Sequence, residues 1–369
     1  MADWLSSMQQ TFEYYVVDPG TWKDTKLLTN VKSCTINRDS SVETRGSATI
    51  SITESIGECY VRVYLVTTQN GVKEKHPLGT FLVQTPSSSF NGKIKEVSMD
   101  AYTPLIELKE VQPPIGYFIP KSTSENEVNI MDIAYRLARE NVRAPVVKTE
   151  NSTLNQSDFV SDTSDTWLSF LSDFVANQVY VVDQKTLANA RYELDLDEMG
   201  RIIFSPKQDT ASLQPVWTYD DGNSSILYPD INIDHDLYNV PNVVEVVYTN
   251  GGDNWSARAE NRNPNSPTSI QNRGREIVRR VINPDLYGNP TKAQVQEYAD
   301  QFLEALSTLE YTVTYTHAYC PVRVGDCVRL NYSRGGLVDI KAKVVSQSIK
   351  CTPGCPVSEK SVYVAKLWR

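Results

Sequence analysis

Alternating large and polar residues near both ends of the chain constrain the fold most. Tyr60 to Val66 places a large side chain at every second position. Tyr311 to Cys320 alternates strictly, with tyrosines, Val313 and His317 on one face and threonines on the other. A period of two is typical of β-strands that bury one face. We therefore expect β-sheet in the first and the last third of the chain.

The first hundred residues predict five or six short antiparallel strands joined by polar turns. Asn70-Gly71 is a type I′ hairpin signal, because both turn positions need a positive φ. The other strands are expected at Val31–Ile36, Ser47–Ile52, Lys73–Val83 and Val97–Tyr102. Gln112-Pro113-Pro114 interrupts the pattern, since consecutive prolines cannot continue a ladder. An N-terminal antiparallel β domain, a barrel or a sandwich, is therefore predicted over residues 1–112.

Helical spacing of apolar residues then predicts a small α+β insert over residues 113–235. Ser124-x-x-Glu127 has the spacing of a capping box, and apolar positions recur at helical spacing through Glu140. A second helix is expected to start near Asp165. A hairpin with its turn at Asp197 to Gly200 is expected to pack on both helices.

The pattern returns to β in residues 236–369, where a second β domain that ends in an antiparallel meander is predicted. Thr291-x-x-Gln294 caps an embedded helix over 291–308. The strands are expected at Val243–Thr249, Trp255–Ala259, Arg275–Ile282, Tyr311–Cys320, Cys327–Tyr332, Val338–Lys350 and Ser361–Trp368, with a turn at Asn250-Gly251-Gly252. The predicted fold class is mostly β, with two antiparallel barrel-like domains flanking the α+β insert.

Composition excludes several classes of protein. With 22% charged and 40% hydrophobic residues in 369, the chain is neither wholly disordered nor a small disulfide-stapled fold. The net charge of −9 argues against a large DNA-binding face, because nucleic acids are bound mainly by cationic side chains. No run reaches the roughly 18 apolar residues of a membrane span, and Met1-Ala2-Asp3-Trp4 does not begin a signal peptide, so we expect a soluble protein.

Four cysteines near the C-terminus are the clearest candidates for a special site. Cys351 and Cys355 have a spacing that zinc sites use, and Cys320 and Cys327 lie upstream. A disulfide between Cys351 and Cys355 or between strands, and free thiols, are the alternatives, with free thiols favoured. Cys34 and Cys59, in neighbouring predicted strands, leave the same choice open. No metal or cofactor is predicted.

Two acidic stretches could hold a cation but fit a simpler interpretation. Asp195-x-Asp197-x-Met199-Gly200 resembles the start of a calcium loop, yet its fifth position is Met199 and its twelfth is Pro206, which favours an acidic turn. Asp230, Asp234 and Asp236 surround His235, but they alternate with apolar residues, which favours the solvated face of a strand.

Candidate catalytic residues and candidate stacking residues are few, and packing roles are favoured for them. His317 could act as a base, although no nucleophile with an orienting carboxylate is evident, and a packed histidine is favoured. Tyr311, Tyr315 and Tyr319 could stack sugars or bases, although core or interface packing is favoured. The chain has no Walker A loop, Gly-x-Ser-x-Gly elbow or His-Glu-x-x-His, so no catalytic residue is predicted.

Short phrases along the whole chain carry a family resemblance. They are Arg45-Gly46-Ser47-Ala48, Pro77-Leu78-Gly79-Thr80-Phe81, Asp165-Thr166-Trp167-Leu168, Gly200-Arg201-Ile202-Ile203-Phe204, Tyr238-Asn239-Val240-Pro241-Asn242, Arg273-Gly274-Arg275 and Val324-Gly325-Asp326. Their order resembles the tail hub (baseplate hub) proteins of tailed bacteriophages and related contractile injection systems.

The resemblance implies a structural part of a virion, located at the tail tip or baseplate and assembled in the cytoplasm of the bacterial host. Such hubs are homotrimers whose two tube-like domains per chain adapt a six-fold tail tube or distal tail ring to a three-fold spike or central fibre. They line the channel for genome ejection, so the tape-measure protein and passing DNA are further implied partners. Because the chain ends soon after the second β domain, no wall-degrading activity is expected.

Two other functions remain as alternatives. A carbohydrate-binding tail component would use exposed aromatics such as Tyr315 or Trp255. A cell-wall hydrolase would need a site that none of the motifs reveals.

Overall fold

The structure is a computed structural model that describes residues 2–54, 56–90, 92, 95–149, 152–177, 179–183, 188–207, 210, 212–235, 237–238, 240–250, 253–284 and 290–366. The chain forms two compact units. The first comprises Met1–Asp230 and Tyr315–Lys360, and the second comprises Ile231–Thr314 and Ser361–Arg369.

The N-terminal strands form an antiparallel sheet, as predicted. They are β1 (Gln9–Val17), β2 (Asp24–Leu27), β3 (Val31–Asp39), β4 (Gly46–Ile52), β5 (Cys59–Gln69), β6 (Val72–Phe90) and β7 (Lys95–Tyr102). Asn70 and Gly71 join β5 to β6 with φ of 51° and 78°, so the predicted hairpin is confirmed. The strands β1 and β2 were not expected from the alternation pattern.

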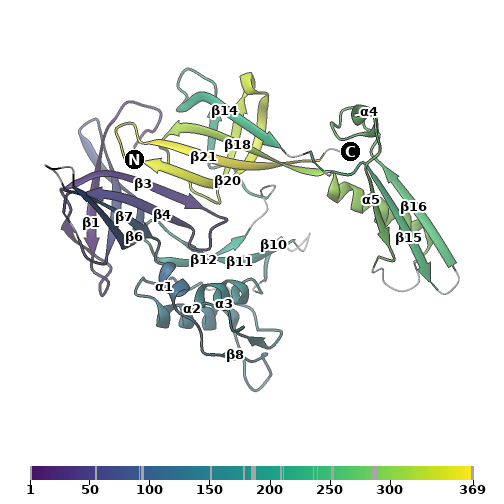
Figure 1. Cartoon of the computed structure of the whole chain (residues 1–369), viewed down its shortest axis with the longest axis horizontal. Coiled ribbons are helices and arrows are strands. Elements are labelled where there is room, and N and C mark those ends of the chain that lie inside the picture. Colours follow the sequence, from purple (N-terminus) through teal and green to yellow (C-terminus); the bar gives the residue numbers. More distant parts are fainter. Residues whose placement is uncertain are drawn as a thin grey trace. The chain divides into compact units, whose positions relative to one another are not determined.

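Helices and a hairpin follow in the same unit. The elements are α1 (Ile106–Glu110), β8 (Phe118–Ile119), α2 (Ile130–Asn141), β9 (Phe159–Val160), α3 (Trp167–Val175), β10 (Val179–Asp183), β11 (Ala188–Leu196) and β12 (Ile202–Lys207). Figure 1 shows α1, α2 and α3 gathered on one side of β11 and β12. Their apolar faces share one core, which includes Met131, Phe170, Phe174 and Leu194.

The predicted capping box at Ser124-x-x-Glu127 is wrong. Helix α2 begins only at Ile130, and its N-cap Asn129 makes no side-chain capping bond. The preceding residues form a turn instead, in which the backbone N–H of Asn126 donates to Thr123 Oγ1. Serine and threonine side chains bond such turns as readily as helix starts, so the pattern alone did not separate the two.

The later strands join the N-terminal sheet. They are β13 (Trp217–Asp220), β14 (Leu227–His235), β18 (Thr308–Ala318), β19 (Cys327–Tyr332), β20 (Leu337–Lys350) and β21 (Pro356–Lys366), with the 3-10 turn η1 (Ser333–Gly335) before β20. Strand β20 pairs antiparallel with β3. Within the described residues the strand order is β14-β18-β21-β20-β3-β4-β7-β6-β5-β1-β2, with β19 also beside β20. The first and the last third of the chain therefore contribute strands to one sheet, in which the pairing of β3 with β20 joins them.

The second unit contains a three-stranded sheet and one long helix. Besides parts of β14, β18 and β21, its elements are β15 (Val243–Asn250), β16 (Asp253–Glu260), α4 (Ile270–Arg273), β17 (Val278–Ile282) and α5 (Lys292–Leu306). The capping box of Thr291 and Gln294 at the start of α5 is confirmed. Strand β17 pairs parallel with β15, although only antiparallel pairs were expected. In the first unit, β13 also pairs parallel with β19. The predicted turn residues Gly251 and Gly252, and Trp368, lie outside the described residues.

The mostly β fold with a small helical insert is confirmed. The division into domains at 1–112, 113–235 and 236–369 stays a prediction. Across the part of the chain that the structure describes, no helix has the length and apolarity to span a bilayer.

Candidate functional site

The candidate calcium loop at Asp197 to Gly200 is a hairpin turn that packs against the N-terminal sheet. The carbonyl of Met199 accepts hydrogen bonds from Trp22 Nε1 at 2.7 Å and from Arg62 Nη2 at 3.1 Å. Gly200 follows with a φ of 73°, and a Cβ placed there would lie 2.6 Å from the Cβ of Thr80. The turn therefore fastens the β11–β12 hairpin onto the β5–β6 hairpin. Asp197 bonds within the turn, where its Oδ1 accepts from the backbone N–H of Arg201.

Arg62 is the buried cation that holds this contact together. Its side chain is 1% exposed, with Nη1 2.7 Å from Asp24 Oδ1 and Nε donating to Thr80 Oγ1 at 2.9 Å. A buried guanidinium is tolerated only when its donors find acceptors, and here a carboxylate, a hydroxyl and a carbonyl supply them. Arg62 is not among the residues predicted from the sequence to form a site. Its position inside an otherwise apolar strand, Tyr60 to Val66, could have indicated a buried charge.

His317 belongs to a buried polar cluster, which we define as Tyr219, Tyr315, His317, Cys320, Gln347 and Glu359. His317 Nε2 lies 3.3 Å from Glu359 Oε2 and 3.1 Å from the Tyr219 hydroxyl. Glu359 also accepts from the Tyr315 hydroxyl and from Gln347 Nε2, each at 2.6 Å. The strands β18, β20, β21 and β13 supply five of these groups, and Cys320 lies two residues after the end of β18, so only the assembled sheet brings them together.

The cluster keeps His317 charged. Burial disfavours the imidazolium, but hydrogen bonds with Cys320 and Glu359 and the negative charge of Glu359 outweigh it and raise the pKa of His317 to about 10. His317 Nδ1 lies 2.7 Å from the carbonyl of Ala318, so both ring nitrogens have acceptors. His317 and Glu359 are each fully buried. A protonated imidazole without access to solvent cannot serve as a general base for a bound substrate.

The cysteines are unpaired in the structure, as in the alternative that the sequence favoured. All six are free thiols. Cys320 lies in the buried polar cluster, 3.4 Å from the Tyr219 hydroxyl. Cys351 lies opposite Cys34, whose carbonyl accepts from the backbone N–H of Cys351 at 3.0 Å. Across the described residues, no group of three or more His, Cys, Asp or Glu is arranged to hold a metal ion.

The tyrosines of β18 do not form an exposed platform along the strand. Tyr315 and Tyr319 are 2% and 7% exposed and pack inside the first unit. Tyr311 is half-buried in the second unit and stacks between two rings, with centroids 4.8 Å from His235 and 5.0 Å from Tyr363. The favoured interpretation as packing residues agrees with this arrangement.

The aspartates around His235 lie on the solvated face of a strand, which was the favoured interpretation. Asp230 and Asp234 are exposed on β14, with the half-buried Ile231 and Ile233 alternating between polar residues. Asp234 accepts from Asn232 Nδ2 at 2.9 Å, and Asp236 lies outside the described residues.

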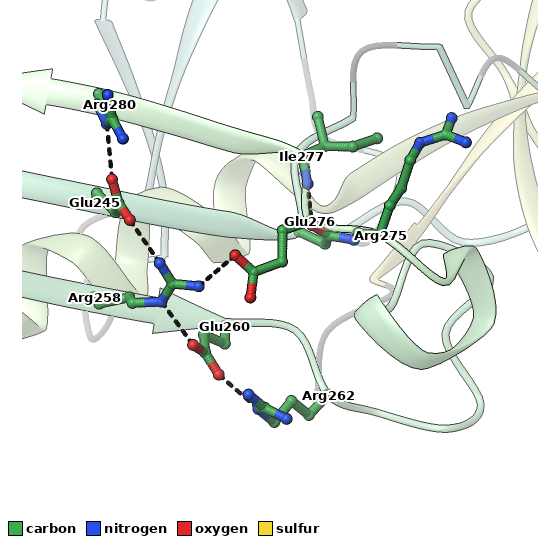
Figure 2. Close-up of polar contacts among 9 residues, drawn as sticks. Glu245, Arg258, Glu260, Arg262, Arg275, Glu276, Ile277 and Arg280 are labelled. Atoms are coloured by element: carbon green, nitrogen blue, oxygen red, sulfur yellow. Dashed lines mark hydrogen bonds and ion pairs between the residues drawn. The ribbon is translucent and has the colours of Figure 1, made fainter.

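A ladder of ion pairs crosses the three-stranded sheet of the second unit (Figure 2). Glu245 on the central strand β15 meets Arg258 of β16 at 2.6 Å and Arg280 of β17 at 2.8 Å. Arg258 also reaches Glu260 and Glu276, at 2.6 and 2.7 Å. These guanidinium groups lower the pKa of Glu245, that of Arg280 foremost. Exposed ion pairs add little to stability because solvent screens them, so the ladder determines the charge pattern of the surface more than it stabilises the fold.

The other side of this sheet is covered by helix α5 (Figure 1). Val244, Val246 and Ala257 pack with α5 residues such as Ala299, whereas Glu245 and Arg258, one position away, point to the opposite face. Beside the ladder, Val247 and Ile282 are paired in register and are 40% and 72% exposed. The sheet thus presents an open face with charged and apolar parts, flanked by the edge strands β16 and β17.

Comparison of folds identifies the architecture. Over 97% of its length the chain matches 98% of the tail protein from Neisseria meningitidis, with a TM-score of 0.58 and 15% identity. The 43 kDa tail protein of prophage MuSo2 from Shewanella oneidensis matches with a TM-score of 0.57 and 11% identity, over 95% of this chain and 98% of that one. This chain has the fold of phage tail proteins. No protein-family model and no curated protein matches the sequence.

A chain of a further complex has a similar fold. The Francisella PdpA-VgrG complex contains a chain that matches with a TM-score of 0.51 and 8% identity. This match covers 96% of the present chain and 58% of the other. The order of phrases that resembled tail hub proteins therefore corresponds to a shared fold, although identity in each pair is low.

Proposed function

We propose that the protein is a non-enzymatic structural component of a phage-like tail. In this proposal it is a homotrimeric hub that joins the six-fold tail tube or distal tail ring to a three-fold spike or central fibre. The hub lies at the tail tip or baseplate, is assembled in the host cytoplasm and lines the channel through which DNA leaves during genome ejection. The tape-measure protein is a further partner.

The match to the Neisseria tail protein carries this proposal. It covers 97% of this chain and 98% of that chain, so the correspondence extends over nearly all of both chains. A fold shared over the full length supports a shared role more strongly than one common domain would, although fold by itself does not establish function.

Unpaired strand edges support a role in assembly. Within the described residues β2, β16 and β17 each end a sheet, so each leaves one edge of backbone donors and acceptors without a strand partner. Isolated edges of this kind favour uncontrolled association unless charges protect them or another subunit covers them. Arg279 and Arg280 protect β17, and a ring of subunits would cover such edges in a defined way.

The buried polar cluster supports the absence of catalysis in this proposal. Its histidine and carboxylate are fully enclosed, because Gln347 and Tyr315 donate to Glu359 and the Tyr219 hydroxyl lies against His317 Nε2. Carbohydrate recognition through Tyr315 or Trp255 has no matching surface, because Tyr315 is buried and Trp255 packs beside the core under α5.

Native mass spectrometry and electron microscopy of the purified protein test the proposal. We expect a species of three times 41.5 kDa and particles with three-fold symmetry that bind rings of the tail-tube protein from the same genome. A protein that stays monomeric at micromolar concentration, alone and with the tube protein, would contradict it. Hydrolysis of purified peptidoglycan by the wild-type protein would contradict the non-enzymatic part.

A further inference from the structure

Three buried thiols meet in the core of the first unit. Cys34 lies on β3, whereas Cys351 and Cys355 bound the turn between β20 and β21. All three belong to the same hydrophobic core cluster. We propose that Cys34 and Cys351 form a disulfide under oxidising conditions, which staples the N-terminal sheet to the last hairpin of the chain. This inference stands on geometry and does not depend on the proposed function.

The register of the sheet places the two cysteines opposite each other. Strands β20 and β3 pair from Ser346 with Asp39 to Lys350 with Thr35, and the next pair along this antiparallel register is Cys351 with Cys34. The backbone N–H of Cys351 donates to the Cys34 carbonyl at 3.0 Å, so the ladder continues to this pair. Opposite residues of such a pair have Cα atoms about 5.5 Å apart, which lies inside the range of disulfides.

The side chains also point toward each other. Ile36 and Ile349, two positions back along each strand, are buried in the same cluster, so Cys34 and Cys351 share that inward face. Cys351 is the largest cause of the raised pKa of Cys34, which agrees with two neighbouring thiols on this face. Since opposite Cβ atoms in a sheet are about 4.5–5.5 Å apart and disulfides prefer about 3.8 Å, closure requires a small inward movement.

The chemistry is a two-electron oxidation of two thiols. A peroxide first oxidises one thiol to a sulfenic acid and leaves as water or alcohol. The second thiol then attacks that sulfur, the S–S bond forms, and water leaves. Hydrogen bonding to Cys351 and burial raise the pKa of Cys34, so little thiolate is present and we expect closure to be slow.

Cys355 is the competing partner, since it is fully buried near Cys351. It is held by a turn, in which its N–H donates to the carbonyl of Thr352 at 2.8 Å, and its own φ is 40°. A link between Cys351 and Cys355 would close only a short loop within one turn. A link from Cys34 to Cys351 joins segments more than 300 residues apart in sequence, which restricts the unfolded chain far more.

Oxidation of the intact wild-type protein tests the proposal directly. The protein is treated with a slight excess of hydrogen peroxide or diamide, alkylated in denaturant and digested without reduction. We expect one linked pair of peptides containing Cys34 and Cys351, and a melting temperature higher by about 5 °C or more that returns to its starting value with dithiothreitol. Cys34→Ala should abolish the link and the shift, whereas Cys355→Ala should keep both.

Several outcomes would overturn the proposal. They are six alkylated cysteines after oxidation, a link between Cys351 and Cys355 in the wild-type protein, or over-oxidised thiols without a link. Peptide mapping of the wild-type protein distinguishes them even if a cysteine variant fails to fold. A trimer with no such link would leave the proposed function intact, because the two readouts are independent.

Discussion

At the scale of single residues, the protein buries charged side chains in its interior. Arg62 is paired with Asp24, and His317 is paired with Glu359. Buried ion pairs add little net stability compared with apolar packing, but removing one partner leaves the other charge without compensation. These buried ion pairs therefore help to specify which strands pair with each other. Mutation of one partner should have a large effect on stability.

Glu359→Gln should destabilise the first unit strongly. The amide keeps the size of the side chain but removes the negative charge facing His317, so we expect a loss of about 3–5 kcal/mol in the free energy of unfolding at pH 7. Urea denaturation followed by tryptophan fluorescence measures it. Glu310→Gln, an exposed carboxylate on the same strand as His317, is the matched control and should change stability by less than about 0.5 kcal/mol. Equal stability of the two variants would show that the pair is not charged.

The same pair predicts a pH dependence with a definite sign. The pKa of His317 is raised to about 10 in the folded protein, above its ordinary value of 6.5. Its contribution to stability is therefore complete below pH 6.5 and is lost as pH rises from there through about 10. The stability difference between the wild type and His317→Gln should shrink over that window. A difference that grows with pH would contradict the charged assignment.

At the scale of elements, close backbone contacts connect the insert to the sheet. The turn at Met199-Gly200 lies against Trp22, Arg62 and Thr80, without space for a Cβ at Gly200. The sequence predicted an acidic hairpin turn here, and a turn connects β11 to β12 in the structure. The sequence could not show what the turn contacts, because its partners are more than 100 residues away.

Gly200→Ala should loosen this contact. The new Cβ would need a left-handed backbone, with a φ of 73°, and would lie 2.6 Å from the Cβ of Thr80, so we expect a loss of about 2–4 kcal/mol. Gly336→Ala is the matched control, since its φ of 77° carries the same backbone strain but nothing lies within 4 Å. Thermal unfolding of both variants measures the difference. A cost no greater than that of Gly336→Ala would refute the close contact.

At the scale of the whole molecule, the first and last thirds of the chain share one ladder and one core. Ile349, Cys351 and Val357 from the C-terminal strands pack with Ile36 and Ile50 from the N-terminal ones. Trp4 adds to this connection, with its ring 4.9 Å from His76 and 5.2 Å from Tyr319. A domain boundary near residue 112 therefore does not mean that residues 1–112 are self-sufficient.

Residues 1–112 expressed alone should lack a cooperative unfolding transition. Strand β3 would lose its partner β20, and the N-terminal core would lose the apolar side chains of the last hairpin. The same fragment joined through a flexible linker to residues 315–360 should recover cooperative unfolding, measured by circular dichroism. A fragment 1–112 that unfolds as cooperatively as the linked form would support the three-domain division instead.

Local signals sufficed where the contacts are local. The Asn70-Gly71 hairpin and the capping box of Thr291 and Gln294 depend on residues within three positions of each other, and both are present in the structure. The Ser124-x-x-Glu127 pattern failed because a turn competes for the same side chains. Strand alternation identified the inner face of β18 but not the partners of its buried histidine.

The amino-acid sequence alone predicts a mostly β chain with a helical insert, a negative net charge, and tyrosines that pack in sheets and interfaces. Only the tertiary structure decided that β3 pairs with β20, that Glu359 meets His317 and that Cys34 faces Cys351. The physical reason is the range of the interactions. Periodicity and capping act within a few residues, whereas these pairings join segments 42 to more than 300 residues apart, and many registers satisfy the same alternation until the strands pack together.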